Sequence, residues 1–282
     1  MENVSNVDEM LLINKRQKLY YEDIKDGNLV NKGNFLTQLW RKARRSQQAF
    51  RTEIKVNEYI YSLHNEWLGD LRNKAVLDLG CYDGNHLSLS IAQKAKYYLG
   101  IDLSEPATEI LANKLRNQNI KNAYAKAVDF LSAEFQQEYK GKFDVIYAHS
   151  VLHHFKYFDD LLLKCHSILK EDGYIISLDP LQTNNTMNFI RYLYRPFQSD
   201  KDWEYPFKKE SLAQIKKYFK IENVQGMMGK TKLAIPLFFI NKKLGLKVAG
   251  KFFNHDKAYA NNEGKALYDC LQITMKLKRI PF

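Results

Sequence analysis

A glycine-containing turn and an aspartate stand at the ends of two apolar segments, where they could bind a nucleoside. The run VLDLGCYDG, residues 76–84, leads from an expected strand into an expected helix. Gly80 and Gly84 allow the backbone to come close to a ligand, and the first turn of a helix offers unpaired N–H groups. The next apolar segment ends in Asp102. Its carboxylate can accept hydrogen bonds from both hydroxyls of a ribose, so we expect a nucleoside between these two segment ends.

The spacing of the glycines argues against a dinucleotide site. The dinucleotide fingerprint is G-x-G-x-x-G, and its three glycines form the turn that holds a pyrophosphate. Here Tyr82 stands between Gly80 and Gly84, so one of the three glycines is missing. A nucleoside ligand without phosphates fits this loop better.

Strand-like and helix-like segments alternate from residue 75 onward. Short apolar runs bounded by Gly, Asp or Asn predict strands, and longer runs with helical periodicity predict helices. The expected strands are 75–79, 97–102, 122–127, 143–149 and 174–178, and the expected helices are 85–94, 106–117 and 158–169. This alternation predicts a parallel, doubly wound sheet. In such sheets ligands bind outside the carboxyl ends of the strands, where the glycine turn and Asp102 would lie.

The remaining segments depart from this alternation. Residues 34–66 have apolar residues at helical spacing, and residues 230–265 are rich in lysine and apolar residues, so both predict helices. Residues 170–173 predict a turn before the fifth strand, and residues 219–224 predict a sixth strand. Apolar and polar residues alternate over 271–277, which predicts a last strand, antiparallel and with one face exposed to water.

The order of the motifs resembles that of the class I S-adenosylmethionine-dependent methyltransferases. The resemblance covers residues 70–180 and rests on five segments. They are DLGCYDG (78–84), YLGIDLS (98–104), AVDF (127–130), FDVIYAHSVLHHF (143–155) and LKEDGYIISLDP (169–180). Each segment is a weak signal alone, and their shared order and spacing make the resemblance specific. The chain departs from the family at Tyr82, where many members have a second glycine, which implies a reshaped loop.

The resemblance implies S-adenosylmethionine as the cofactor and S-adenosylhomocysteine as its product. It places Asp78 and Gly80 against the methionine part and Asp102 at the ribose. It also places Asp129 at the adenine amino group, Phe130 beside the adenine ring and His149 near the sulfonium. The full set of expected cofactor-binding residues is Asp78, Gly80, Cys81, Tyr82, Gly84, Asp102, Leu103, Asp129, Phe130 and His149. Taken singly, Asp78 and Asp129 are also typical of residues that cap a turn or a helix, and Cys81 of a small buried side chain.

The patterns and the resemblance together predict an α/β fold. We expect a doubly wound, seven-stranded, mostly parallel sheet of the Rossmann-like methyltransferase type, with an N-terminal helical cap and C-terminal insertions. Four regions are expected along the chain. They are a helical cap at 1–70, a cofactor-binding core at 71–180, a substrate-side insertion at 181–210, and the last strands at 211–282 with a Lys-rich helical cap at 230–265.

Three histidines, His149, His153 and His154, follow closely on the fourth expected strand. Histidine titrates near neutral pH and can act as a general base toward a hydroxyl, so His153 and His154 are candidate catalytic residues. LHHF is also a frequent variant of the family's fourth motif, in which one histidine packs or hydrogen-bonds locally, so a structural role stays open. Adjacent histidines on a turn usually point apart, and no nearby carboxylate has ligand spacing, so no metal site is predicted.

Residues 181–210 follow the fifth strand, where the fold usually places the acceptor site. They are rich in polar and aromatic side chains and resemble a bacterial methyltransferase subgroup with an asparagine and a Tyr-Arg pair at this point. Arg191, Tyr194 and Arg195 are the candidate substrate-binding residues. Arg195 could bind an acidic group of the acceptor or form a structural ion pair.

The net charge of +11 belongs to the last part of the chain. Residues 1–73 carry a net charge of +2, residues 74–180 of −2 and residues 181–282 of +11. Residues 230–253 combine apolar residues with six lysines and no acidic residue. That composition suits weak contact with an anionic membrane surface, a cap with solvated lysines, or a lid over a hydrophobic acceptor. No RNA-binding module is recognisable, so nucleic acid is not the favoured partner.

The rest of the composition is typical of a globular cytoplasmic protein. The three cysteines are widely spaced, which indicates neither a disulfide framework nor a zinc ribbon. The first residues lack the pattern of a secretory signal. The longest apolar run, LAIPLFFI at 233–240, is far shorter than the ~20 residues of a membrane span. A hydrophobic content of 45% argues against a disordered chain.

The sequence therefore predicts an enzyme that transfers a methyl group from S-adenosylmethionine to a small-molecule acceptor by direct in-line displacement. The expected reaction is O- or N-methylation of a biosynthetic metabolite, which could be linked to a glycan or a lipid. An RNA methyltransferase is the alternative enzyme. A non-catalytic S-adenosylmethionine-binding module is the alternative that is not an enzyme.

Overall fold

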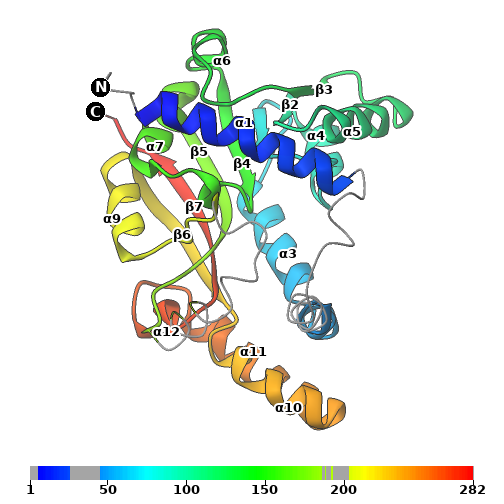
Figure 1. Ribbon diagram of the computed structural model, residues 1–282, viewed down its shortest axis with the longest axis vertical. Coiled ribbons are helices and arrows are strands. Elements are labelled where there is room, and N and C mark those ends of the chain that lie inside the picture. The colour runs from blue at the N-terminus through cyan, green and yellow to red at the C-terminus, as the bar shows by residue number, and fades with distance from the viewer. Residues whose placement is uncertain (1–5, 26–44, 186–187, 189–191, 193–202, 282) are drawn as a thin grey trace.

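A seven-stranded sheet organises the protein (Figure 1). The computed structural model describes residues 6–25, 45–185, 188, 192 and 203–281. The strand order is β3-β2-β1-β4-β5-β7-β6. The strands are β1 (Ala75–Leu79), β2 (Tyr97–Asp102), β3 (Ala123–Ala127), β4 (Phe143–His149), β5 (Leu169–Pro180), β6 (Phe219–Met227) and β7 (Gln272–Arg279). The first five are parallel, and β7 is antiparallel to both of its neighbours. The predicted doubly wound, mostly parallel sheet is confirmed.

Helices cover both faces of this sheet. One face carries α3 (Val56–Leu68), α4 (Ser88–Lys94) and α5 (Glu105–Asn117), and the other carries α6 (Ala133–Tyr139), α7 (Phe158–Ile168) and α9 (Lys209–Tyr218). Successive strand residues point to opposite faces. Val76 and Tyr98 therefore lie in the core under α3 to α5, while Leu77 and Leu99 lie in the core under α6, α7 and α9. Both faces are apolar because both are covered.

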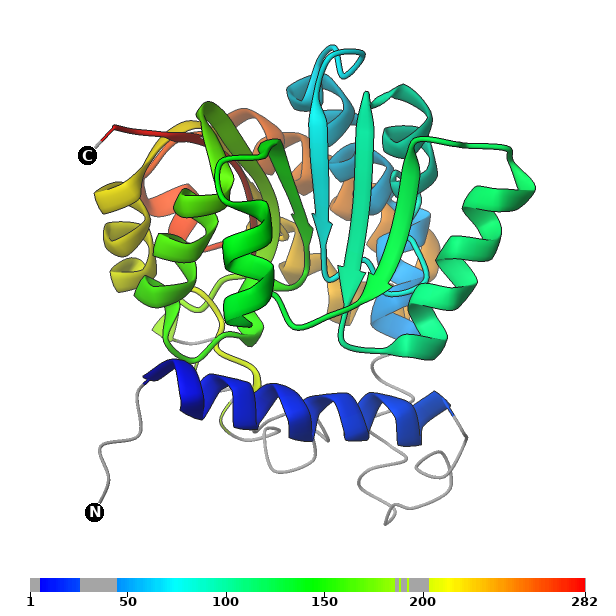
Figure 2. The same ribbon diagram turned by 90° about the horizontal axis from the view of Figure 1, so that it is seen from above.

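A long helix, α1 (Asn6–Lys25), crosses the edge of the sheet at which the parallel strands end (Figure 2). Met10 of α1 is buried in the same core as α7. Glu9 forms an ion pair with Lys156, with Oε1 and Nζ 2.6 Å apart. A helical cap was expected at 1–70, but no separate helix was predicted for these residues. The effect of α1 is to cover the edge where ligands bind in such folds.

The segment that follows β6 forms a second helical layer at one end of the molecule. It consists of η4 (Lys230–Ala234), α10 (Ile235–Ile240), α11 (Lys242–Tyr259) and the short α12 (Lys265–Tyr268). This confirms the predicted helices at 230–265. A third apolar cluster, which includes Phe50, Val56, Met227 and Phe253, joins this layer to the N-terminal helices. None of the helices in the described residues combines the length and the apolarity that crossing a bilayer requires.

Several expected boundaries need correction. Residues 170–173 are part of β5, but they bulge, because Phe143 pairs with Leu169 while Val145 pairs with Tyr174. The predicted exposed face of the last strand is wrong at Thr274, which is fully buried. That strand lies inside the sheet, between β5 and β6, and α3 packs over it. Residues 45–53 and α3 account for the described part of the helices expected at 34–66.

Candidate active site

A cavity of about 390 Å³ opens at the carboxyl ends of the parallel strands, beneath α1. Its volume is within the ~300–1,000 Å³ of small-molecule sites. The wall combines apolar side chains of the strand ends with a few polar groups. Of the residues expected from the sequence, Gly80, Tyr82, Asp102, Leu103, Asp129, Phe130, His149 and His154 line the cavity. The structure therefore brings most of the expected cofactor-binding residues to one place.

The loop after β1 can pass close to the chain after β4 only because it contains a glycine. Gly80 has a φ of 67°, in the left-handed region, and a Cβ on it would lie 2.5 Å from Cγ2 of Val151. Tyr82 also has a positive φ of 48°, a conformation that costs energy for a residue with a side chain. Tyr82 therefore takes a backbone conformation typical of glycine and also lines the cavity.

Asp102 ties this loop to the end of β2. Its Oδ2 accepts a hydrogen bond from the backbone N–H of Tyr82 at 3.0 Å, and its Oδ1 accepts one from the N–H of Ser104 at 2.9 Å. Burial raises the pKa of this carboxyl. Each carboxylate oxygen can accept more than one hydrogen bond. Asp102 therefore keeps the capacity to accept from the two hydroxyls of a ribose, and this wall fits the adenosyl part of the expected cofactor.

Asp129, after β3, contacts α1 directly. Its Oδ1 accepts from the N–H of Leu131 at 2.9 Å, and the side-chain amide of Asn14 donates to both carboxylate oxygens at 3.0 Å. Burial raises the pKa of Asp129. Asn14 shares its cavity-facing side with Gln17 and Lys18, at the spacing of one helix face. The sequence analysis missed these three residues, and their polar i, i+3, i+4 pattern was the available signal.

Three expected cofactor residues lie behind the loop and do not line the cavity: Asp78, Cys81 and Gly84. Asp78 is almost fully buried and accepts hydrogen bonds from the hydroxyls of Ser88 and Tyr98, each at 2.7 Å. Burial raises the pKa of Asp78 to about 6. Cys81 is buried too, and burial raises the pKa of its thiol. In this arrangement Asp78 joins the end of β1 to β2 and α4 through its two hydroxyl partners.

The two candidate catalytic histidines have different surroundings. His153 is buried, and Oδ1 of Asp179 lies 2.9 Å from its Nδ1 and 3.1 Å from its backbone nitrogen. This pair ties the short helix η1 (Leu152–His154) to the end of β5. His154 lines the cavity, and its Nδ1 lies 3.0 Å from the backbone oxygen of Trp203. The structure thus brings His154, and not His153, to the cavity.

A buried chain of polar side chains leads from β7 to His149 at the end of β4. The hydroxyl of Thr274 donates to the backbone oxygen of Ser177 at 2.7 Å, so its oxygen is free to accept from Nε2–H of His64, also at 2.7 Å. Burial lowers the pKa of His64 to about 3, so this ring is neutral at pH 7. A neutral ring with a proton on Nε2 has an acceptor at Nδ1.

The phenol of Tyr147 continues the chain. Its oxygen lies 3.3 Å from Nδ1 of His64 and 3.4 Å from Nδ1 of His149. Since His64 needs a donor at Nδ1, Tyr147 donates there and accepts from Nδ1–H of His149. This assignment satisfies every buried atom of the chain. It leaves Nε2 of His149 with a lone pair that no described residue uses, on a residue that lines the cavity. Burial lowers the pKa of His149 to about 4, so this ring is neutral as well.

Arg51 lies at the same edge of the sheet, and no carboxylate of the described residues pairs with it. Its Nη1 donates to Oε1 of Gln272 at 2.6 Å, and its Nη2 donates to Oδ1 of Asn57 at 3.1 Å. Gln272 begins β7 and pairs with Pro180 at the end of β5. Burial lowers the pKa of Arg51, and its charge helps to lower the pKa of His149. A guanidinium with neutral partners is suited to an anionic group of a ligand.

The expected substrate-binding residues Arg191, Tyr194 and Arg195 lie outside the described residues. Arg51 was not among the site residues expected from the sequence. Its role at the strand ends depends on Gln272, more than two hundred positions later, so no local pattern could reveal it. Within the described part of the chain no group of His, Cys, Asp and Glu has the arrangement of a metal site.

Comparison with known proteins agrees with this geometry. The family model described as a methyltransferase domain matches residues 50–234. This range contains the five parallel strands and most of the cavity-lining residues. Geranyl diphosphate C-methyltransferase from Streptomyces coelicolor, solved with Mg²⁺, geranyl diphosphate and S-adenosyl-L-homocysteine, superposes with a TM-score of 0.54 over 79% of this chain and 80% of that one. At 11% identity this is a likeness of fold.

The curated relatives match over shorter stretches. An uncharacterized RNA methyltransferase of Clostridium tetani is 34% identical over 97 residues, which are 34% of this chain and 21% of that protein. The ubiquinone biosynthesis O-methyltransferase of Glaesserella parasuis is 31% identical over 111 residues, which are 39% of this chain and 46% of that protein. The chain thus spans less than half the length of each of these two relatives.

The neutral state of His64 predicts how stability depends on pH. An unfolded histidine has a pKa near 6.5, and that of folded His64 is about 3. Between these values the unfolded chain binds the proton more tightly, so protonation removes stability as the pH falls. Urea unfolding at pH 7 and pH 5 gives the free energy of unfolding at each pH. Between the two pH values this free energy should fall by about 2 kcal/mol less in His64→Gln than in the wild type. An equal loss in both proteins would contradict a neutral, buried His64.

Proposed function

The chain belongs to the methyltransferase domain family of S-adenosylmethionine-dependent enzymes, and we propose that its acceptor is a small molecule that carries an anionic group and is methylated on a hydroxyl. The observation that carries this proposal is that His149 lines the cavity while Arg51 lies at the same edge of the sheet, where its charge helps to lower the pKa of His149. His149 offers a lone pair at Nε2, and Arg51 a guanidinium without a carboxylate partner among the described residues.

The cavity wall would hold the cofactor through residues with separate tasks. Asp102 would bind the ribose, and Asp129 and Phe130 would lie at the adenine, with the loop at Gly80 passing close to the methionine part. When bound, S-adenosylmethionine supplies an already activated methyl group. The protein's remaining tasks are to orient the acceptor and to keep water out. Helix α1 contributes to the second task because it covers the cavity with Asn14, Gln17 and Lys18.

His149 is the residue best placed to manage the acceptor's proton. Its Nδ1–H is committed to Tyr147, so Nε2 can accept a hydrogen bond from the acceptor hydroxyl and orient its oxygen. As that oxygen becomes methylated, its proton passes to Nε2. Because the pKa of His149 is about 4, the imidazolium returns the proton to water once the site opens. His154 also lines the cavity and remains a candidate for the same role, as the sequence suggested.

Arg51 would set the class of acceptor. A guanidinium binds carboxylates and phosphates in a defined geometry, and Gln272 and Asn57 hold that of the half-buried Arg51 in place. RNA offers phosphates as well, and a relative named an RNA methyltransferase matches part of the chain. A chain that only binds the cofactor is the third possibility. Turnover assays separate all three.

The acceptor class is tested by measuring how much S-adenosylhomocysteine forms when small hydroxyl compounds are offered as acceptors. The compounds are tested in matched pairs, in which one member carries a carboxylate and the other carries the corresponding neutral amide. We expect turnover with carboxylates or phosphates, and Arg51→Gln should raise KM for the anionic partner at least about tenfold with a smaller effect on kcat. Arg72→Gln is the matched control, because Arg72 is exposed and paired with Asp70. Preference for the neutral partner, turnover on RNA alone, or no turnover at all would contradict the proposal.

The role of His149 is tested with the best acceptor from that screen. His149→Gln should lower kcat about 100-fold, since proton transfer to a placed base is worth roughly that factor, and should leave KM within a few-fold. His86→Gln serves as the control, because His86 is an exposed histidine whose ring contacts the same tyrosine, Tyr61, without lining the cavity. A wild-type kcat in His149→Gln would exclude His149 as the base and favour His154.

A further inference from the structure

The hairpin of α10 and α11 carries large apolar side chains that the described protein leaves uncovered. Ile240 is 83% exposed, Phe239 55% and Leu244 47%. None of the six residues of α10 is buried. The hairpin projects at one end of the molecule, away from the strands β1 to β3 (Figure 1). An exposed apolar group of this kind marks an interaction surface.

A row of lysines runs along α11 beside this apolar end. Lys243, Lys247 and Lys251 are exposed and follow one another at intervals of four residues, so they share one face of the helix. The opposite face, with Gly245, Ala249 and others, is buried against the protein. Residues 230–253 contain no acidic side chain. Positive charge and exposed apolar side chains therefore occur together on this hairpin.

The two helices of the hairpin are tightly joined. A Cβ on Gly245 would lie 2.3 Å from Cα of Phe238, so the helices can approach this closely only with glycine there. The side chain of Asn241, between the helices, accepts from the N–H of Leu244 at 3.1 Å. Phe238 packs edge-to-face on Phe50, with ring centroids 5.2 Å apart. One side of α10 thus packs inward, while Phe239 and Ile240 remain outside.

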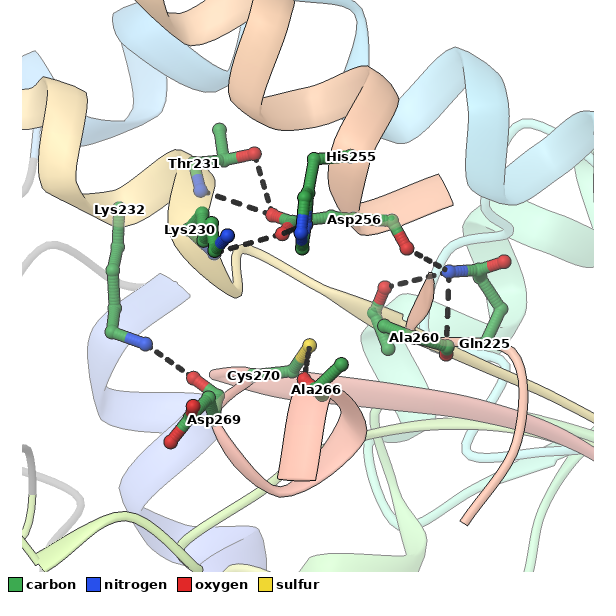
Figure 3. A network of polar contacts seen from close by, with 11 residues as sticks. Gln225, Lys230, Thr231, Lys232, His255, Asp256, Ala260, Ala266, Asp269 and Cys270 are labelled. Atoms are coloured by element: carbon green, nitrogen blue, oxygen red, sulfur yellow. Dashed lines mark hydrogen bonds and ion pairs between the residues drawn. The ribbon is translucent and has the colours of Figure 1, made fainter. Parts of the chain in front are cut away.

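A buried carboxylate anchors the base of the hairpin (Figure 3). Asp256 of α11 accepts from the backbone N–H of Lys230 at 2.8 Å and of Thr231 at 3.0 Å, and from the Thr231 hydroxyl at 2.6 Å. The side-chain amide of Gln225, on β6, donates to the backbone oxygen of Asp256 at 3.0 Å. The hairpin is therefore fixed to the sheet, and the exposure of its end is a feature of the fold.

We propose that the end of the α10–α11 hairpin docks on an anionic lipid bilayer. Phe239 and Ile240 would enter the interface between headgroups and acyl chains, and Lys243, Lys247 and Lys251 would lie among the anionic headgroups. A cationic polar face beside aromatic and aliphatic side chains is the composition that binds such interfaces. A second copy of the chain would bring the lysine rows of both copies together, and like charges repel. The proposal does not depend on the identity of the methyl acceptor.

The test is co-sedimentation of the full chain with lipid vesicles. The wild type should bind vesicles of phosphatidylcholine with about one third phosphatidylglycerol, and should bind pure phosphatidylcholine far less. The double variant Phe239→Ser/Ile240→Ser and the triple variant Lys243→Gln/Lys247→Gln/Lys251→Gln should each lower the partition coefficient about tenfold or more. All five side chains are exposed. Both variants should therefore unfold at about the same temperature as the wild type.

The matched control removes the same charge elsewhere. The triple variant Lys96→Gln/Lys121→Gln/Lys140→Gln changes exposed lysines around β2, β3 and α6, and its vesicle binding should stay within about twofold of the wild type. An equal loss in this control would overturn the proposal, as would a wild type that does not bind anionic vesicles. Two other results would also overturn it. One is binding to RNA that needs the lysines but not Phe239 and Ile240. The other is a dimer that depends on these two residues, in a protein that does not bind vesicles.

Discussion

The contact between the Asp102 carboxylate and two backbone N–H groups is the interaction on which the site depends. It joins the loop after β1, through Tyr82, to the turn after β2, through Ser104. The loop reaches this position because Gly80 adopts a left-handed conformation against Val151. Burial makes the carboxylate costly unless it is hydrogen-bonded. The same atoms that hold the two loops together therefore form a cavity wall that is ready to accept the hydroxyls of a ribose.

The proposed acceptor side rests on contacts between distant parts of the chain. His149 ends β4, but its orientation depends on Tyr147, on His64 of α3 and on Thr274 of β7. Arg51 depends in the same way on Gln272, at the start of β7. The antiparallel strand β7 lies between β5 and β6, so residues near the end of the chain reach the strand ends from inside the sheet. The last part of the chain thus supports the proposed acceptor residues as well as covering the fold.

The sequence predicted the parallel core accurately and the ends of the chain less well. The bounds of β1, β2 and β4 agree with the expected 75–79, 97–102 and 143–149, because buried parallel strands are short apolar runs bounded by Gly, Asp and His. Helix α1 lies within the helical cap expected at 1–70, but its bounds were not predicted, because the residues that it turns toward the cavity, Asn14 and Gln17, are polar. Its buried side therefore lacks the apolar stripe by which amphipathic helices are recognised.

Residue type identified the cofactor side better than the acceptor side. Gly80, Asp102 and Asp129 stand at motif positions, and the structure places all three at the cavity. Asp78 stands in the same motif, but it does not line the cavity, and its carboxylate accepts hydrogen bonds from Ser88 and Tyr98 instead. The tautomer of His149 follows from a hydrogen-bond chain that spans four elements, which no pattern in the sequence expresses. Sequence spacing therefore predicts the residues that stand at the ends of consecutive strands. Only the folded structure shows which residues from distant parts of the chain contact them.

The central claim is that the cavity around Asp102 binds the cofactor, and calorimetry with S-adenosylhomocysteine tests it most directly. The wild type should bind, and Asp102→Ala should bind at least about tenfold more weakly, since hydrogen bonds to a charged acceptor are lost. Asp83→Ala is the control, because Asp83 lies in the same loop but pairs with Lys114 and does not line the cavity. Its affinity should equal that of the wild type. Undiminished binding by a folded Asp102→Ala, or no binding by the wild type, would contradict the account.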